Sequence, residues 1–236
     1  MIKKTIIFLV VLMFTPFFSY GQAAILALIL GDKVSTEKFN LSLEIGGNFT
    51  HYSHLENFDR TRLGINFGIA GNIKVSPRFY ISPNVIFLGD RKIKFNSLSP
   101  DTTNEILNNQ FSNVPTDLNL SYIDIPILFS YLNKRENFKY SFGPQYSFLQ
   151  KADMVYFGDD GEFTQGFSSK MSSNDYGFIT DIAYIFKNFK GEKDMHIHLR
   201  YYYGMKDIFR SSFDSSMNRS SYVSVMLSFP FIKKEK

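Results

Sequence analysis

The sequence predicts an all-β fold, an eight-stranded antiparallel up-and-down transmembrane β-barrel. Eight segments after residue 38 alternate apolar or aromatic residues with small, polar or charged ones, which is the period of a strand with two different faces. The 236 residues include 26 Phe and 14 Tyr but no Trp, so strand formers are abundant. No stretch after residue 22 is apolar for long enough to form a membrane helix. A chain that crosses lipid with strands must close them into a barrel.

The first 21 residues are predicted to be a cleaved signal peptide. Lys3 and Lys4 precede a short apolar run, and the small residues Ser19 and Gly21 occupy the −3 and −1 positions of a cleavage site. An uncleaved anchor would need about 20 apolar residues, and this run is shorter. Cleavage would lower the formal net charge of +4 by two, so the mature chain is near neutral and no nucleic-acid partner is expected.

The next segment, residues 22–38, is predicted to be an apolar stretch and a linker. Residues 23–30 are all apolar and are followed by Gly31, so they could form a short helix of about 12 Å, too short to span a bilayer. Such a helix could lie against the periplasmic rim of the outer membrane, plug the barrel mouth or bind a periplasmic partner, and the first of these is favoured. A flexible leader is the alternative. The barrel domain follows at 39–231, and a basic tail at 232–236 ends the chain.

The eight strands are predicted at 39–50, 62–73, 79–95, 118–132, 138–153, 175–187, 194–206 and 219–231. Short charged turns at 74–78, 133–137 and 188–193 alternate with longer polar loops at 51–61, 96–117, 154–174 and 207–218. Short periplasmic turns and long outer loops are typical of outer-membrane barrels. The alternation therefore predicts location in the outer membrane, with both barrel ends on the periplasmic side.

Each strand is justified by an apolar stripe that opposes a polar one. The seventh strand is the clearest, because Ile197, Leu199 and Tyr201 interleave with two histidines and an arginine. The first, second, fifth and eighth strands repeat the pattern with stripes that include Leu41, Ile45, Leu63, Ile65, Phe138, Phe142, Val223 and Val225. The alternation alone does not say which stripe faces inward, since a lipocalin-like barrel buries its apolar stripe. The signal peptide, the loop asymmetry and the aromatic residues favour an apolar stripe that faces lipid.

Aromatic residues near the strand ends are predicted to form the two interfacial girdles of such a barrel. They are Phe39, Phe49, Tyr52, Tyr131, Phe138, Tyr176, Phe186, Phe209, Phe213 and Phe231. Small residues on the other stripe, such as Gly64, Gly68 and Gly143, suit a narrow, packed interior.

Three blocks of sequence, at 122–128, 143–149 and 200–208, together resemble the PorT-type outer-membrane β-barrel family of Bacteroidota. The blocks read Tyr-Ile-Asp-Ile-Pro-Ile-Leu, Gly-Pro-Gln-Tyr-Ser-Phe-Leu and Arg-Tyr-Tyr-Tyr-Gly-Met-Lys-Asp-Ile. The resemblance implies an eight-stranded outer-membrane barrel with no known catalytic site. The expected partners are outer-membrane lipid and an envelope or secretion-system protein, although the secretion role of the name-giving member is not carried over.

Charged residues on the polar stripe are the candidate site. Glu44, Asp124 and Asp181 could pair across the lumen with Arg62 and Arg200, because a low-dielectric interior penalises an unpaired charge. A structural charge lock is favoured over a gate or an ion path, since the side chains of an eight-stranded barrel fill its interior. The predicted function is a structural or envelope-interaction barrel without an open pore. A porin-like barrel for small solutes or lipids is the alternative.

No metal or cofactor is expected. His196 and His198 share a face, but two ligands do not complete a zinc site. The loop sequence at 159–162, Asp-Asp-Gly-Glu, lacks the alternating ligand spacing of an EF-hand.

Catalysis is not expected either. Some small outer-membrane barrels are hydrolases or acyltransferases, and His51, His54 and Asp59 lie together in the first long loop. Sequence proximity does not place a base within hydrogen-bond reach of an acid, and the chain has neither a Gly-x-Ser-x-Gly elbow nor a His-Glu-x-x-His helix.

Overall fold

The computed structural model describes residues 36, 38–55, 58–159, 161–187, 194–211, 213 and 216–231. Strands dominate this part of the chain: β1 (Phe39–Tyr52), β2 (Phe58–Lys74), β3 (Phe79–Leu98), β4 (Val114–Leu132), β5 (Phe138–Gly158), β6 (Gly161–Gly166), β7 (Asn174–Phe186), β8 (Met195–Asp207) and β9 (Arg219–Pro230). A short helix, α3 (Glu105–Gln110), and a single 3-10 turn, η1 (Ser168–Lys170), complete the elements. None of the described helices is long and apolar enough to cross a membrane.

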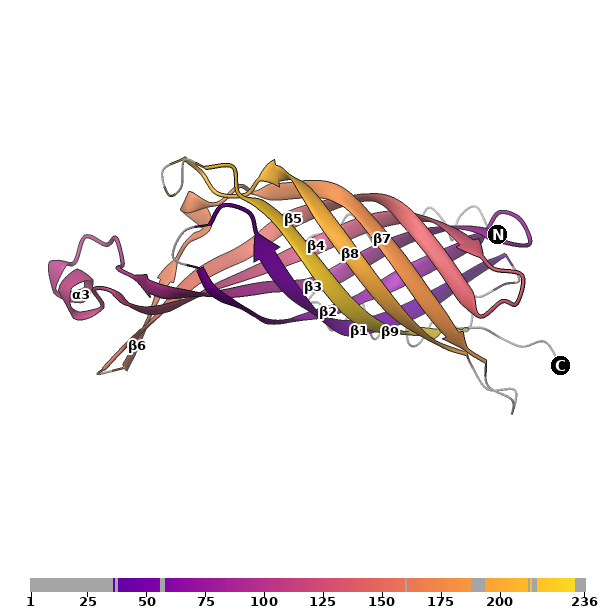
Figure 1. Cartoon of the computed structure of the whole chain (residues 1–236), viewed down its shortest axis with the longest axis horizontal. Helices are drawn as coiled ribbons and strands as arrows, with labels where there is room; N and C mark the ends of the chain where they lie inside the picture. The colour runs from indigo at the N-terminus through magenta and orange to yellow at the C-terminus, as the bar shows by residue number, and fades with distance from the viewer. Residues whose placement is uncertain are drawn as a thin grey trace, which may run out of the picture.

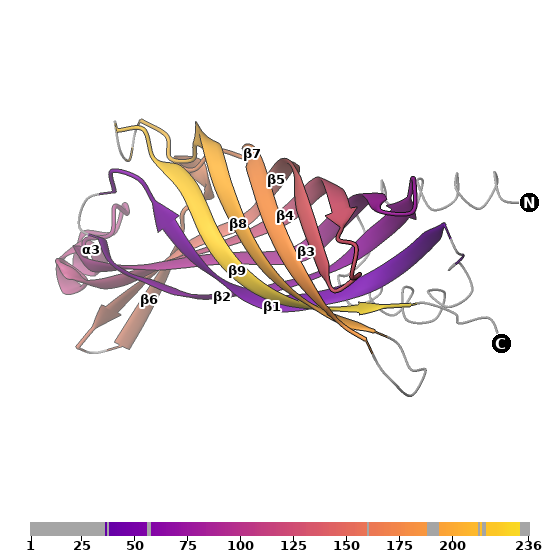
Figure 2. The ribbon, with the colours of Figure 1, turned by 45° about the vertical axis from the view of Figure 1, so that its right-hand side comes forward.

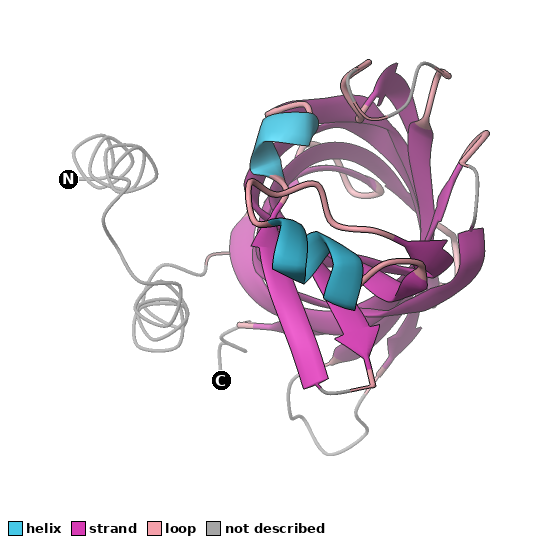
Figure 3. Cartoon of the chain, turned by 90° about the vertical axis from the view of Figure 1, so that its left-hand side faces the viewer, coloured by secondary structure: helices cyan, strands magenta, loops and turns pink. Residues whose placement is uncertain are grey.

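Eight of the strands close into a ring, as predicted (Figures 1 and 3). Each strand pairs antiparallel with its neighbour in the order β1-β2-β3-β4-β5-β7-β8-β9, and β9 pairs back onto β1. β6 lies outside the ring, where it forms a hairpin with the outer end of β5. The predicted eight-stranded antiparallel barrel is therefore confirmed.

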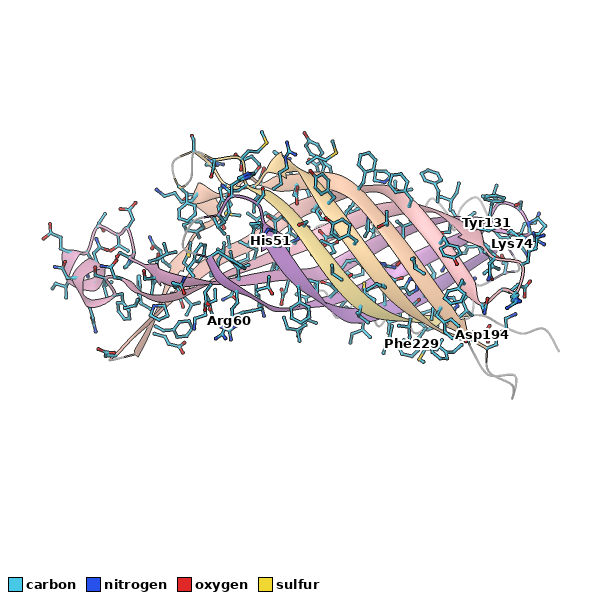
Figure 4. The ribbon with its side chains drawn as sticks, viewed as in Figure 1. His51, Arg60, Lys74, Tyr131, Asp194 and Phe229 are labelled. Atoms are coloured by element: carbon cyan, nitrogen blue, oxygen red, sulfur yellow. The ribbon has the colours of Figure 1, made fainter. Side chains whose placement is uncertain are left out.

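The apolar stripe faces outward over the middle of the barrel. Ile65, Phe142 and Val225 expose 48%, 51% and 54% of their surface, whereas Glu44 on the opposite face of β1 exposes 1%. Figure 4 shows such side chains projecting from the wall, with Tyr131 and Phe229 toward the end that carries the short turns. A water-soluble barrel would bury this stripe, so the outside of the ring is built to contact lipid.

The barrel continues beyond this apolar band on the long-loop side, where β3, β4, β5 and β6 project past the other strands together with α3 (Figure 2). Residues 96–98, 114–117, 154–158 and 161–166, predicted as loop, belong to these strands, and the second long loop also contains α3. We call the projecting part of β3–β6 with α3 and η1 the outer extension. The sequence pattern placed these strand boundaries wrongly because the faces change their surroundings. In the outer extension the apolar face of a strand points inward and its polar face points to water.

Two β-bulges produce that exchange. On β3, Phe67 pairs with Leu88 but the next residue of β2 pairs with Ile86, so β3 carries one extra residue. On β5, Tyr122 pairs with Leu149 while Ser121 pairs with Lys151, which again leaves one extra residue. An extra residue reverses which of the odd and even positions face inward. On the short-turn side of the bulges the apolar stripe faces lipid. On the long-loop side the same stripe points into the barrel.

On the long-loop side of the bulges, the inward-pointing residues form a hydrophobic core of the kind found in water-soluble proteins. We call this cluster the mouth core; its buried members are Tyr52, Ile93, Phe95, Phe111, Leu118, Leu120, Tyr122, Ala152, Met154, Tyr156, Phe167, Met171, Ile208 and Phe209. Residues from β1, β3, β4, β5 and the loops after β6 and β8 meet here, so the core fills the outer end of the barrel. Burial raises the pKa of the Tyr156 hydroxyl to about 12.

The mouth core corrects part of the girdle prediction. Tyr52 and Phe209 are only 3% exposed, Phe213 packs on the same core and Phe231 is 7% exposed, so these four do not face lipid. Tyr131 and Phe186 at the short-turn end do face outward, and the ring of Tyr131 is tilted against that of Phe79 with centroids 5.2 Å apart. Aromatic residues near a strand end can lie on either face, and position along the chain does not distinguish them. The predicted signal peptide, the 23–30 helix, the 188–193 turn and the basic tail lie outside the described residues.

Candidate functional site in the barrel lumen

The half of the lumen nearer the short turns is crossed by one arginine from β8. The guanidinium of Arg200 donates from Nη1 and Nη2 to both carboxylate oxygens of Glu44, at 2.8 and 2.7 Å, and from Nε to Asp181 Oδ2 at 2.7 Å. His198 Nδ1 lies 2.9 Å from the same Asp181 oxygen. All four side chains are buried. We call Glu44, Asp181, His198 and Arg200 the inner charge cluster.

A second arginine crosses the lumen closer to the mouth core. Arg91 of β3 donates to Asp124 Oδ1 at 2.9 Å and to Asp175 Oδ2 at 2.8 Å. The hydroxyls of Ser147 and Ser220 accept further hydrogen bonds from it at 3.1 and 3.0 Å. The Arg91 side chain is 1% exposed. We call Arg91, Asp124 and Asp175 the outer charge cluster.

Aromatic rings and one glycine shape the space for Arg91. Its guanidinium carbon lies 4.1 Å from the ring centroid of Tyr122 and 5.3 Å from those of Tyr202 and Tyr222, within cation–π distance. A Cβ on Gly89 would lie 2.7 Å from Asp124 Oδ2, so glycine at this position leaves room for the carboxylate. The lumen is therefore packed around the ion pairs.

One small cavity lies in the lumen among the described residues. A cavity of about 10 Å³ lies beside the inner charge cluster and is lined by Lys139, His196, Ser82, Ser141 and their neighbours. That volume is at the lower limit for one water molecule. Lys139 Nζ donates to Asn72 Oδ1 at 3.1 Å on the same side.

Three of the five predicted lock residues meet each other in the structure. Glu44, Asp181 and Arg200 form the inner charge cluster, and Asp124 joins a different arginine in the outer one. Their role as a stability lock stays a prediction.

The structure corrects the prediction that Arg62 lies in the lumen. Its side chain is 48% exposed and pairs with Asp117 on the outside of the barrel. β2 carries an extra residue between Arg62 and Asn66 in its pairing with β3, so the alternation that points Asn66 inward points Arg62 outward. The two residues would share a face only in a strand without a bulge.

Sequence reasoning missed Arg91, Asp175 and Lys139 as lumen charges. Arg91 lies above the β3 bulge, where odd-numbered residues turn inward, so a regular alternation assigns it to the lipid face. Asp175 and Lys139 are each the second residue of their strand, at positions that the alternation does place inward. The sequence therefore contained a signal for both.

In the described part of the chain, the residues considered for metal binding and for catalysis do not come together in one site. His196 and His198 have ring centroids 6.0 Å apart, and no group of three or more His, Asp or Glu there could hold a metal ion. Asp59 pairs with Arg60 at 3.7 Å. His51 packs edge-on against Phe58, and His54 Nδ1 lies 3.4 Å from the Met217 carbonyl. Asp159 and Glu162 flank the β5–β6 turn, where Gly158 pairs with Gly161.

Several solved structures are similar to this chain. Neisserial surface protein A is 12% identical, with 81% of this chain and 96% of that chain covered at a TM-score of 0.41. Ail, the attachment invasion locus protein of Yersinia pestis, is 9% identical, with 83% and 99% covered at 0.41. OprG from Pseudomonas aeruginosa is 10% identical, with 83% and 98% covered at 0.36. No curated protein matches the sequence.

The family comparison is the decisive one. The sequence model of the family described as "outer membrane protein beta-barrel domain" matches residues 31–210, which is most of the chain. The match includes every residue of both charge clusters and ends before β9. The ring of eight strands and its lipid-facing stripe agree with that family and with an outer-membrane location. This chain belongs to the outer membrane protein beta-barrel domain family.

Proposed function

We propose that the protein is a sealed outer-membrane barrel with a structural or envelope-interaction role. The observation that supports the proposal is that two buried arginine clusters and the mouth core succeed one another along the barrel axis. An eight-stranded barrel is only just wide enough for its own side chains, so these layers leave no conduit. We further propose that the chain belongs to the PorT-type branch, which rests on the blocks at 122–128, 143–149 and 200–208.

The outer extension is the part best suited to meet an envelope partner. It projects beyond the ring (Figure 2), and its mouth core holds it rigid without help from lipid. β6 pairs with β5 along one edge, so its other edge offers backbone groups to an added strand. A rigid surface loses little conformational entropy on binding. An envelope or secretion-system protein is the class of partner proposed.

Conductance in planar bilayers tests the sealed lumen against a porin-like barrel for small solutes or lipids. The purified full-length protein is expected to give no steady conductance, with a porin of known pore size as the positive control in the same bilayer. A steady channel that also passes large solutes would overturn the proposal and favour transport.

Crosslinking in whole cells tests the interaction role. Photo-crosslinking residues placed at Ile106 on α3 and at Thr164 on β6 are expected to capture a specific envelope protein, since both positions are exposed on the outer extension. The same group at Leu199, which faces lipid, serves as the matched control and should capture none. Equal capture at all three positions would count against a docking surface on the extension.

A further inference from the structure

A cavity on the outside of the barrel, at the outer end of β9, belongs to neither charge cluster. It measures about 260 Å³ and is lined by Ser53, His54, Tyr203, Met217, Arg219, Ser220 and Ser221. On β9, Ser220 and Tyr222 are buried toward the lumen, whereas Arg219 and Ser221 lie on the opposite face. The cavity therefore opens toward the surroundings of the barrel.

The cavity lies where the apolar surface of the barrel ends. Val223 is flanked across its two ladders by Phe49 and Tyr201, and the three side chains are 44%, 55% and 46% exposed. Ser221, two residues further out and about 7 Å along the strand, lies between His51 and Tyr203 in the next outward-facing row. Tyr at such a height is typical of the interface between hydrocarbon and head groups. The cavity thus lies level with the polar layer of the outer leaflet.

One cation in this cavity has hydrogen-bonding capacity to spare. Arg219 donates from Nη1 to the Tyr203 hydroxyl at 3.2 Å and from Nη2 to Met217 Sδ at 3.0 Å. Its Nε is shielded from solvent and has no hydrogen-bond partner. Among the described carboxylates, none forms a salt bridge with Arg219, whereas Arg62 pairs with Asp117 and Arg91 with Asp124 and Asp175. The positive charge of Arg219 is therefore not neutralised by a described carboxylate.

The walls of the cavity are fixed before any ligand arrives. The turn after β1 is fastened to β9, because Ser53 N donates to the Arg219 carbonyl at 3.0 Å and Arg219 N donates to Ser53 Oγ at 2.9 Å. His54 has a left-handed backbone with φ of 56°, and its carbonyl accepts a hydrogen bond from Ser216 Oγ at 3.3 Å. A strained non-glycine residue held in this way is often part of a ligand clamp.

We propose that this cavity binds the phosphate-bearing head group of a lipid in the outer leaflet. Arg219 supplies the charge and the planar donor geometry that suits phosphate. The Ser221 and Tyr203 hydroxyls offer further hydrogen bonds, and Met217 gives an apolar wall for the part of the lipid next to the head group. The inference depends on the outer-membrane location of the barrel and not on whether its lumen conducts.

Lipid binding to the full-length protein in neutral detergent tests this site. The probe is a fluorescent glycolipid with two phosphates, compared with a phosphate-free glycolipid that carries the same acyl chains. We expect the phosphorylated lipid to bind more tightly, and Arg219→Gln to weaken that binding about tenfold, because a charge-assisted contact is lost. Arg219→Lys should recover part of it. Arg78→Gln, at an exposed arginine in a turn at the other end of the barrel, is the matched control and should change nothing.

Several outcomes would overturn the proposal. They are equal affinity for both lipids, no effect of Arg219→Gln, an equal loss with Arg78→Gln, or displacement of the lipid by inorganic phosphate at the same concentration as by unlabelled lipid. The last result would indicate a site for a free anion. If Arg219→Gln fails to fold, Met217→Gln replaces it, with a loss of several-fold expected for the phosphorylated lipid. Bilayer conductance of the same variants is read separately, so failure here leaves the sealed-lumen proposal untouched.

Discussion

The membrane half and the outer half of this barrel are built on opposite plans from the same strands. In the membrane half, apolar residues face lipid and the interior holds the inner and outer charge clusters. In the outer half, the interior is the mouth core and the outside carries charged residues such as Lys92, Lys94 and Lys151. The contrast follows from the solvent on each side, because apolar surface gains nothing from burial against other side chains when lipid already covers it.

The strands reach the second plan in two different ways. On β4 the sequence itself changes phase, since even-numbered Leu118, Leu120 and Tyr122 are apolar in the outer half and odd-numbered Ile125 and Phe129 are apolar in the membrane half. β3 and β5 keep one phase, and a bulge turns the stripe over instead. Even-numbered residues of β5 are apolar on both sides of the bulge, yet Phe142 is 51% exposed and Met154 is 0% exposed. A strand can therefore adapt to a change of solvent either by a shift in its apolar–polar alternation or by a β-bulge that turns its faces over.

The largest expected effect is in the charged interior of the membrane half. Arg200→Ala leaves Glu44 and Asp181 buried without their cation, so we expect the free energy of unfolding to fall by about 3–5 kcal/mol. Urea unfolding of the protein in lipid vesicles measures it. Arg200→Lys keeps the charge and loses the forked geometry. Its free energy of unfolding should lie between those of the wild type and of Arg200→Ala. A loss below about 1 kcal/mol for Arg200→Ala would remove the case for a charge lock.

The apolar interior of the outer half should respond to truncation more than the apolar outside of the membrane half does. Leu118 is 0% exposed in the mouth core, so Leu118→Ala should cost about 2–5 kcal/mol through lost contacts and a cavity. Leu199 is 54% exposed on the lipid face, and lipid can fill the space that Leu199→Ala leaves. The loss there should be nearer 1 kcal/mol. Hydrogen exchange of β4 and β8 under native conditions gives the local comparison, and equal losses would contradict the two-plan interpretation.

Arg62 separates the lumen assignment made from sequence from the surface position in the structure. Removing an arginine from the lumen would cost about 3–5 kcal/mol. The Arg62 side chain is 48% exposed, whereas that of its partner Asp117 is only 5% exposed. We therefore expect Arg62→Gln to lower the free energy of unfolding by about 1–3 kcal/mol in the same urea experiment, because the buried Asp117 carboxylate loses its cation. The loss should shrink in high salt, since the Arg62 end of the pair is open to solvent. A loss as large as that of Arg200→Ala would return Arg62 to the lumen.

The two-residue alternation was sufficient to predict the ring and much of the inner charge cluster. Glu44, Asp181 and Arg200 lie on strands that have no bulge between these residues and the short-turn end, so face and sequence parity stay linked. Arg62 and Arg91 lie beyond bulges, and nothing in a local pattern marks an extra residue that depends on the neighbouring strand. The phase change on β4 at Tyr122 was the available sign that the interior becomes apolar.

The smallest expected effect concerns the short-turn end, outside the membrane, where Lys187 Nζ donates to Glu136 Oε2 at 2.9 Å. This hydrogen bond and the charge of Lys187 lower the pKa of the Glu136 carboxyl from its ordinary value of 4.5. Because the folded pKa is the lower one, the pair stabilises the fold above pH 4.5 and the contribution is lost as the pH falls through the folded value. Both side chains are more than half exposed, so the contribution is about 0.5 kcal/mol or less.

Glu136→Gln measured against the wild type at pH 7 and pH 3 isolates this pair. The difference in free energy of unfolding between the two proteins should be present at pH 7 and should nearly vanish at pH 3, where the wild-type carboxyl is increasingly protonated. Lys187→Gln should show the same pH dependence, since either change removes the same interaction. A difference that grows toward acid would mean that Glu136 is stabilised in its protonated form. Glu136 would then behave like a buried carboxyl, although its side chain is 62% exposed.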